Sequence, residues 1–190
     1  MNYLEIKEKV KQDFCGYESR YFHMLEVEKM ALKLNKYFNF NLDEEKIKIA
    51  SILHDYTKKY SFEESLEIIK NLPLEEIEIW NKSKEVIHSV TSSIIIKDKF
   101  GIDDEEIINA IKYHTTGYPN MGLLTKVIYV ADAIEETRKY DGVNLLREEV
   151  FKDFNKGMLL VMEKTLTYLK ETNQYVNPYT IAAYNYYKED

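Results

Sequence analysis

The sequence of 190 residues contains one cysteine, six glycines and three prolines. A single cysteine, Cys15, cannot form a disulfide within the chain, which favours a reducing compartment and a role for Cys15 as a packing thiol. With so few glycines and prolines there are few places where regular structure must break. No alternation of polar and apolar residues predicts a strand. We therefore expect an all-α fold.

The chain also lacks an excess of positive charge, since 33 acidic residues outnumber 26 lysines and arginines and the formal net charge is −7. This balance disfavours nonspecific binding to nucleic acid or to an anionic membrane, although a local group of lysines and arginines can still attract a small polyanion. No apolar run is long enough to cross a bilayer, and the charged start MNYLEIKEKVKQDF lacks the apolar stretch of a secretion signal. We expect a cytoplasmic protein without a nucleic-acid or membrane partner.

Helix signals follow one another along the whole chain. They include a capping box at Ser61–Glu64 and a glycine stop at Gly101. No Pro-, Gly- or Ser-rich linker separates them, so we expect one helical bundle over residues 1–190, with an N-terminal helix in residues 1–16 packed on it. The expected helices cover residues 1–14, 19–38, 43–55, a helix that starts at 61, a short helix from 73, 83–100, 103–114, 123–140, an interrupted stretch to about 171, and a last segment from 178.

The residues that can carry chemistry are four histidines and two aspartates on or beside apolar helix faces. His114, for example, shares one face with Ile107 and Ile111. Asp132 lies between Ala131 and Ala133 in an apolar stretch, where a carboxylate is costly unless it is compensated. The full set is His23, His54, Asp55, His88, His114 and Asp132.

Each of these side chains taken alone has an ordinary structural explanation, such as a histidine bonded to a carbonyl group or an aspartate paired with a cation. Their joint occurrence in a small bundle favours a metal site, because imidazole and carboxylate groups suit iron, manganese, cobalt or zinc. His54 and Asp55 follow each other at the end of an apolar helix, about 100° apart, so both can reach one ion.

Five stretches carry a resemblance to a known family. Together they resemble the HD-domain phosphohydrolases and, more narrowly, the YqeK-type branch of symmetrical dinucleoside tetraphosphatases, over roughly Ser19 to Tyr187. The sequence departs from that pattern with SVTSS after His88 and with ADAIEETR around Asp132. The matching stretches are SRYFH (19–23), LHDYTK (53–58), YHTTGYPNMGLLTKVIYVADAIE (113–135), YDGVNLLR (140–147) and NQYVNPYT (173–180), together with Arg138.

The resemblance implies an all-helical HD domain with a divalent metal, iron first and manganese, cobalt or zinc as alternatives. It also implies cleavage of diadenosine tetraphosphate in the middle to give two ADP. The implied metal ligands are His23, His54, Asp55 and Asp132, and a second metal at His88 and His114 is an open alternative. Catalytic roles are implied for Asp55, Lys58, His88 and His114. Implied substrate contacts are Arg20, His23, Asp55, Tyr56, Thr57, Lys58, His88, His114, Asp132, Arg138, Tyr175, Val176, Asn177, Pro178, Tyr179 and Thr180.

Other functions remain open at the level of the sequence. A lone cation such as Lys58, Arg20 or Arg138 is more often a helix-end or surface charge, so its phosphate role rests on the resemblance. One alternative is an HD phosphohydrolase that acts on another nucleotide. A second is a non-catalytic sensor that binds metal and nucleotide, and a third is a purely structural bundle. A homodimer is compatible with all of them.

Overall fold

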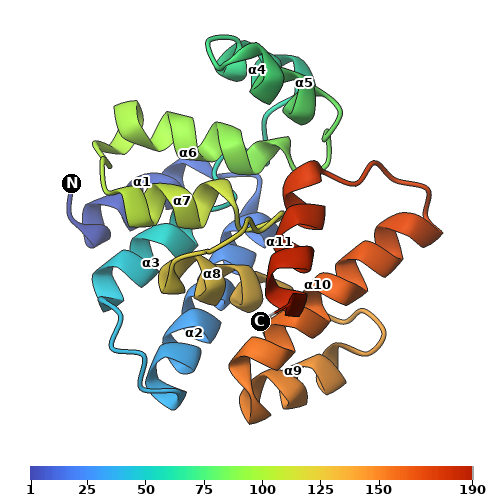
Figure 1. Cartoon of the computed structure of the whole chain (residues 1–190). Helices are drawn as coiled ribbons and strands as arrows, with labels where there is room; N and C mark the ends of the chain where they lie inside the picture. The colour runs from blue at the N-terminus through green and yellow to red at the C-terminus, as the bar shows by residue number, and fades with distance from the viewer. Residues whose placement is uncertain (190) are drawn as a thin grey trace.

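The computed structural model describes residues 1–189 and confirms the all-α class, with eleven helices and no strand in that range (Figure 1). Within the same residues, none of the helices combines the length and apolar character that crossing a membrane requires. The helices are α1 (Tyr3–Asp13), α2 (Glu18–Tyr37), α3 (Glu44–Leu53), α4 (Phe62–Ile69), α5 (Leu74–Asn81), α6 (Ile87–Phe100), α7 (Glu105–Lys112), α8 (Leu123–Ile134), α9 (Val143–Lys152), α10 (Phe154–Glu171) and α11 (Pro178–Glu189).

The main core lies among α2, α3, α7 and α8, and α1 packs against α3 on its outer side (Figure 1). Fully buried aliphatic side chains such as Leu34, Ile47 and Val127 fill it. Burying each such side chain stabilises the fold by about 1.5–3 kcal/mol. The four helices therefore form a rigid support, and side chains at their ends are held in fixed positions.

Helices α4 and α5 form a satellite at the top of Figure 1, above the start of α6. They bury a second, smaller apolar cluster around Trp80 and Ile69. At the other end of the molecule, α9 and α10 pack closely against each other. Gly157 of α10 makes this approach possible, because a Cβ atom at that position would collide with the backbone of Val150.

Two local predictions are confirmed by the geometry of the helix ends. Ser61 and Glu64 form the reciprocal capping box at the start of α4. Gly101 ends α6 in the left-handed conformation, with a φ of 68°. In both cases the residues that fix the helix end are adjacent to it in the chain, so the sequence alone predicts where the helix starts or stops.

Three expectations are wrong. Helix α6 begins at Ile87 rather than at Ser83, because Ser83 closes the preceding helix through a hydrogen bond to the carbonyl of Ile79. Helix α8 ends at Ile134 rather than at Tyr140, since residue 135 turns to an extended conformation with a ψ of 158°. Cys15 is exposed rather than packed in the core.

Candidate active site

The structure brings the four histidines and two aspartates together at one place. His23 comes from the middle of α2 and His88 from the first turn of α6, while Asp132 lies in the last turn of α8. His54 and Asp55 directly follow α3, and His114 follows α7 in the turn beyond its last residue. All are buried except Asp132, which is partly exposed. Five segments far apart in the sequence therefore meet at one cluster.

One half of the cluster consists of His23, His54, Asp55 and Asp132. The Nε2 atom of His23 lies 3.0 Å from Asp132 Oδ1 and 3.7 Å from Asp55 Oδ2. The Nε2 atom of His54 lies 3.7 Å from Asp55 Oδ2 and 4.0 Å from Asp132 Oδ1. Both Nε2 atoms are buried and make no hydrogen bond of acceptable geometry within residues 1–189. Unpartnered imidazole nitrogens that face two carboxylates fit a divalent metal, which would satisfy all four groups.

The opposite ring nitrogens of these two histidines have fixed partners. The Nδ1 atom of His54 lies 2.7 Å from the carbonyl oxygen of Ser51, and Nδ1 of His23 lies 3.2 Å from Oε1 of Glu135. The carbonyl and carboxylate oxygens act as acceptors in these hydrogen bonds, so Nδ1 carries the proton and Nε2 presents a lone pair. Glu135, only 1% exposed, also accepts hydrogen bonds from the backbone and hydroxyl groups of Thr137.

Glu135 is a site residue that the sequence reasoning missed. Glu135 is the last residue of the stretch from 113 to 135, and 112 positions separate it from His23, so sequence proximity does not link the two. The one signal that could have found it is its place on the same face as Asp132, three positions earlier.

The surroundings keep the two aspartates charged and the His54 imidazole neutral, whereas for His23 burial is outweighed by the neighbouring carboxylate of Asp132, which raises the pKa of that ring. Burial lowers the pKa of His54 to about 3. Burial alone would raise the pKa values of Asp55 and Asp132. For Asp55 the neighbouring His54 and His88 outweigh burial, and for Asp132 the Arg138 guanidinium and His23 do so, so both pKa values lie well below the usual range. Neutral nitrogen and anionic oxygen donors are the forms that bind a metal.

The other half of the cluster is the pair His88 and His114. Their Nε2 atoms lie 3.3 Å apart, and they lie 3.0 Å and 3.6 Å, respectively, from Asp55 Oδ1. Lys58 Nζ lies 3.2 Å from Nδ1 of His88 and donates to the carbonyl of Glu85 at 2.8 Å. An ammonium group only donates, so Nδ1 of His88 accepts and its proton resides on Nε2. Burial lowers the pKa of His88 to about 4, which keeps the ring neutral.

Two arginines contact the aspartates at the edge of the cluster. Arg20 Nη1 donates to Asp55 Oδ2 at 2.7 Å. Arg138 donates from Nη2 to Asp132 Oδ1 at 2.5 Å and from Nε to the carbonyl of the same residue at 2.9 Å. A guanidinium has five N–H donors, and these contacts use one on Arg20 and two on Arg138. Both side chains are about one-third exposed, at 36% and 35%, so their other donors can face a ligand.

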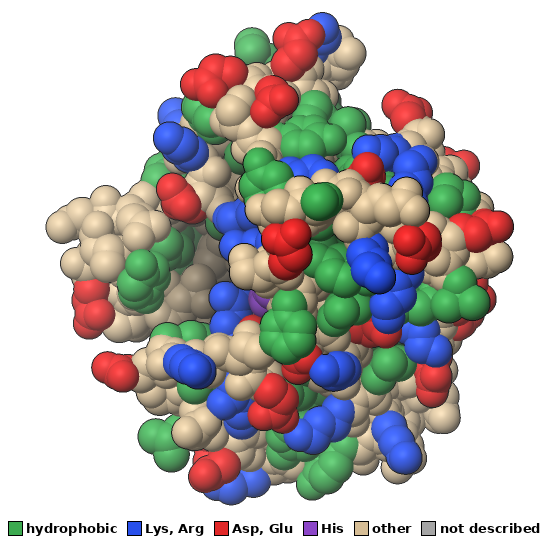
Figure 2. Space-filling view, turned by 180° about the vertical axis from the view of Figure 1, so that it is seen from behind, with side chains coloured by type: hydrophobic (Ala, Val, Ile, Leu, Met, Phe, Trp, Pro, Cys, Tyr) green, Lys and Arg blue, Asp and Glu red, His purple; other side chains and the backbone are tan. Residues whose placement is uncertain are grey.

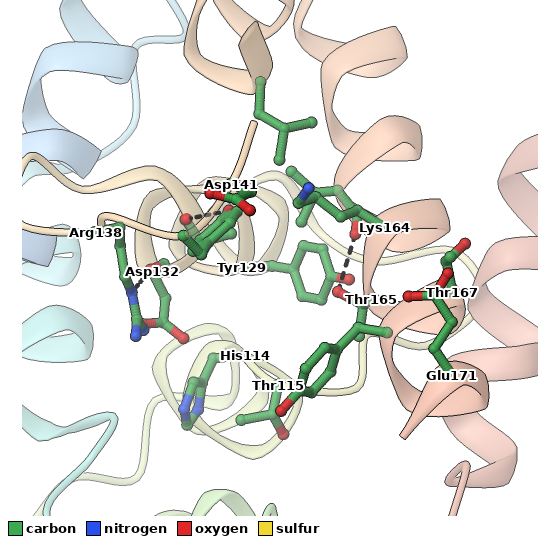
Figure 3. A pocket seen from close by; sticks show the side chains of 15 residues that line it. His114, Thr115, Tyr129, Asp132, Arg138, Asp141, Lys164, Thr165, Thr167 and Glu171 are labelled. Atoms are coloured by element: carbon green, nitrogen blue, oxygen red, sulfur yellow. Dashed lines mark hydrogen bonds and ion pairs between the residues drawn. The ribbon is translucent and has the colours of Figure 1, made fainter. Parts of the chain in front are cut away.

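Two hollows adjoin the cluster. Figure 2 shows a cleft with a histidine at its base and lysine or arginine side chains beside it. The larger hollow, of about 780 Å³, extends from His114 and Asp132 to α10 (Figure 3). The hydroxyl groups of Tyr129 and Thr115 line it and both are buried; that of Tyr129 lies beside Thr165, and that of Thr115 has no hydrogen-bond partner within residues 1–189. The smaller hollow, of about 170 Å³, reaches Lys58 and His88.

Two of the expected substrate contacts, Tyr56 and Thr57, have partners within the fold. Tyr56 is fully buried against Phe100, and its hydroxyl donates to Asp13. Thr57 is buried and bonds Ser92 through its amide nitrogen and the carbonyl of His88 through its hydroxyl. Tyr56 therefore packs between helices, whereas Thr57 both bonds α6 and lines the smaller hollow.

The expected substrate segment from Tyr175 to Thr180 lies against α5 and the start of α6 rather than at the aspartates. Asn177 is buried and donates to Ser83 at 3.0 Å. The ring of Tyr179 lies 5.6 Å from that of Tyr113, the neighbour of His114, and its hydroxyl donates to Glu76. Val176 and Pro178 complete the segment, Thr180 is buried and Tyr175 is exposed.

Comparison with known proteins agrees with this fold and cluster. The family model described as "HD domain" matches residues 20–137. The chain is 36% identical over 186 residues to "Bis(5'-nucleosyl)-tetraphosphatase, symmetrical" of Bacillus subtilis, which covers 98% of this chain and 97% of the relative. It is 35% identical over 168 residues to the protein of the same name from Halalkalibacterium halodurans, covering 88% of each.

A solved structure of an HD hydrolase has the same overall fold as this chain. The crystal structure titled "predicted HD superfamily hydrolase involved in NAD metabolism", from Clostridium acetobutylicum, superposes with a TM-score of 0.88 at 36% identity and covers 100% of this chain and 98% of that one. The chain therefore belongs to the HD-domain hydrolases, in the group that includes the symmetrical bis(5'-nucleosyl)-tetraphosphatases.

Proposed function

We propose that this enzyme hydrolyses diadenosine tetraphosphate symmetrically and releases two ADP. The observation that carries the proposal is the pair of buried, unpartnered Nε2 atoms on His23 and His54, which face Asp55 and Asp132 beside a second histidine pair. Relatives that match almost the whole chain carry the name of that activity. Four cations adjoin the cluster, as a polyphosphate requires: Arg138 and Lys164 line the larger hollow, Lys58 lines the smaller one, and Arg20 contacts Asp55.

The metal would be held by His23, His54, Asp55 and Asp132, and we propose iron, with manganese, cobalt or zinc as alternatives. When bound, such an ion supplies Lewis acidity and lowers the pKa of a water molecule. The tautomers favour one metal rather than two. His88 carries its proton on Nε2 as long as Lys58 donates to Nδ1, so the nitrogen nearest His114 has no lone pair to offer a second ion.

The protein's own side chains would divide the remaining work. Arg20 and Arg138 are placed to neutralise phosphate oxygens through their free donors. His114 donates from Nδ1 to the carbonyl of Ile111 at 2.8 Å, so its Nε2 lone pair can accept the proton of the attacking water. His88 donates a hydrogen bond from Nε2 to the leaving phosphate. A terminal phosphate has a second pKa near 6, so the leaving ADP needs this hydrogen bond and no full proton.

One nucleoside would occupy the larger hollow. Its volume of about 780 Å³ falls within the range of roughly 300–1,000 Å³ that small-molecule sites have. The hydroxyls of Tyr129 and Thr115 offer hydrogen bonds there to a ribose or base. We propose that the segment from Tyr175 to Thr180 contacts the same nucleoside, since the ring of Tyr179 lies beside that of Tyr113, the neighbour of His114.

The test is a chromatographic assay of diadenosine tetraphosphate breakdown after loading the purified protein with iron, manganese, cobalt or zinc. We expect ADP as the sole nucleotide product, with two ADP formed for each substrate consumed. Formation of ATP and AMP would contradict symmetrical cleavage. Tight nucleotide binding without turnover, with every metal, would favour the sensor alternative. We also propose a cytoplasmic enzyme, and light scattering on the purified chain tests the expected homodimer.

A further inference from the structure

Each hollow reaches a different member of the same histidine pair. The larger one is lined by His114 and not by His88, whereas the smaller one is lined by His88 and not by His114. The Nε2 atoms of the two rings are only 3.3 Å apart. A ligand that extends from one hollow into the other therefore passes directly over this pair, beside Asp55 Oδ1.

The smaller hollow has the chemistry of an anion site with an aromatic edge. It contains two lysines and one glutamate, so its local charge is opposite in sign to that of the whole chain. Lys84 is exposed, and its Nζ lies 5.7 Å from the ring centre of Phe62. No carboxylate within residues 1–189 forms an ion pair with it. The lining includes Tyr60, Phe62, Lys58, Lys84, Glu85 and His88.

We propose that the smaller hollow is the subsite for the second half of the dinucleoside tetraphosphate. Lys58 and Lys84 bind its phosphates, and Phe62 lies beneath its nucleoside at the mouth. This inference rests on the proposed function. The volume of about 170 Å³ is too small for a nucleoside and its phosphates together, so the hollow takes the phosphates and leaves the nucleoside outside. Phe62 lines the hollow and is partly exposed, so the uncovered part of its ring offers that base a stacking surface beside Lys84.

The position of the cleaved bond follows from this arrangement. A tetraphosphate that is cut in the middle has two phosphates on each side of the scissile bond, and each side needs its own cations. Arg138 and Lys164 line the larger hollow, beside the carboxylates of Asp132, Asp141 and Glu171. Lys58 and Lys84 line the smaller one, beside Glu85. With both halves held, the central bond lies over His88 and His114 beside the carboxylates, which explains why two equal products would form.

The first test counts ADP molecules bound to the metal-loaded protein by isothermal titration calorimetry. We expect two ADP for each chain in the wild type and one in Lys84→Glu, because the reversed charge repels the second product. Lys82→Glu is the matched control, since Lys82 is exposed in the same connection but does not line the hollow, and it should still bind two. One ADP in the wild type, or two in Lys84→Glu, would overturn the subsite.

The second test separates the subsite from the proposed function. Lys84→Ala should lower kcat/KM for diadenosine tetraphosphate about 10-fold, mainly through KM, as the loss of one hydrogen bond to a charged group predicts. Lys84→Arg should restore most of it, and metal content should stay unchanged. A wild type that forms no ADP from the substrate would contradict the proposed function. The subsite would still be tested by the number of ADP molecules bound in the calorimetric titration. Normal ADP formation with an unaffected Lys84→Ala would overturn the subsite alone.

Discussion

The two histidine pairs of the cluster look alike in the sequence and differ in the structure by the position of one proton. In the pair His23 and His54, both Nδ1 atoms donate to acceptors, a carboxylate and a carbonyl, so both Nε2 atoms offer lone pairs. In the pair His88 and His114, Lys58 donates to Nδ1 of His88, so that ring presents an N–H group on its inner side. The partner of the outer nitrogen decides what the inner nitrogen can do.

The roles that we propose for the two halves rest on this difference. A pair with two lone pairs facing carboxylates binds a cation, whereas a pair with one N–H group and one lone pair can both donate to a phosphate and accept a proton. Asp55 belongs to both halves, since its Oδ2 faces His23 and His54 while its Oδ1 faces His88 and His114. A substitution in either histidine pair tests this difference in function.

The largest contrast is expected between His54→Ala and His88→Gln. His54→Ala removes a lone pair from the metal half, so bound metal should disappear and activity should fall below detection. His88→Gln should keep the metal and lower kcat by roughly 10²–10⁴-fold, the range for a lost proton-transfer or hydrogen-bonding group. Elemental analysis and the metal-dependent rise in melting temperature measure occupancy. Full occupancy in His54→Ala, or in Asp55→Ala, would refute the ligand assignment.

The next test moves the proton of His88 by removing Lys58. Lys58→Met deletes the donor to Nδ1 while keeping the length of the side chain, so the ring can carry its proton on Nδ1 and present a lone pair at Nε2. We expect kcat to fall about 100-fold, within the range for general acid–base groups. We also expect a second metal ion to bind in this variant at high zinc concentration, where the wild type binds one.

Lys59→Met is the control for that experiment. Lys59 follows directly in the sequence, but its ammonium contacts the carbonyl of Asp13 and the ring of Phe14, away from the histidines. It should leave both kcat and metal stoichiometry unchanged. Two metal ions in the wild type would contradict the difference between the two pairs.

A smaller effect is expected from Glu135, which contacts and orients His23 but is not itself one of the four proposed metal ligands. Glu135→Gln removes the negative charge behind the ring, so metal affinity should weaken by about 10–100-fold, as for other groups that hold a metal ligand in place. Activity should return at saturating metal, which distinguishes orientation from catalysis. Glu136→Gln is the control, since Glu136 is exposed and pairs with Lys33. An unchanged metal dissociation constant for Glu135→Gln would remove Glu135 from the site.

The helix starts and stops that sequence analysis predicts well are those fixed by adjacent residues. The box at Ser61 and Glu64 and the glycine at Gly101 need no information from the rest of the chain. The end of α8 does, because ADAIEETRKY contains mostly good helix formers. The helix stops where residue 135 turns inward to His23, which is 112 positions away, and where Arg138 folds back to Asp132.

The site, like the helix ends, could be predicted only where residues close in the sequence determine it. Sequence spacing predicted that His114 would face inward, and the structure buries it although α7 ends two residues earlier, at Lys112. Spacing could not predict that Tyr56 and Thr57, which follow Asp55 directly, have partners on other helices, because the chain leaves α3 in tight turns there. It also could not distinguish the two histidine pairs, since their tautomers depend on partners such as Lys58 and Glu135 that meet them only in the folded chain.

The smallest effect is expected at a carboxylate outside the cluster, Glu76, which joins α5 to α11. It accepts hydrogen bonds from the hydroxyl of Tyr179 and from Nε1 of Trp80, and it pairs with Lys112. Burial alone would raise the pKa of Glu76, but these hydrogen bonds and Lys112 outweigh burial and lower it. In the cluster, histidines and arginines lower the pKa values of the aspartates, whereas here neutral donors and one lysine do so.

Glu76→Gln should lower the free energy of unfolding by about 1 kcal/mol at neutral pH, because the amide can still accept from Tyr179 but turns a donor towards Trp80. Since the pKa of Glu76 is lower in the folded state than the ordinary value of 4.5, its stabilisation is complete above that value and is lost as pH falls through the folded pKa. Urea unfolding of metal-free wild type and variant should therefore converge in acid, while Glu75→Gln, at an exposed neighbour, should match the wild type throughout. A difference that persists undiminished in acid would show that Glu76 acts through packing and not through its charge.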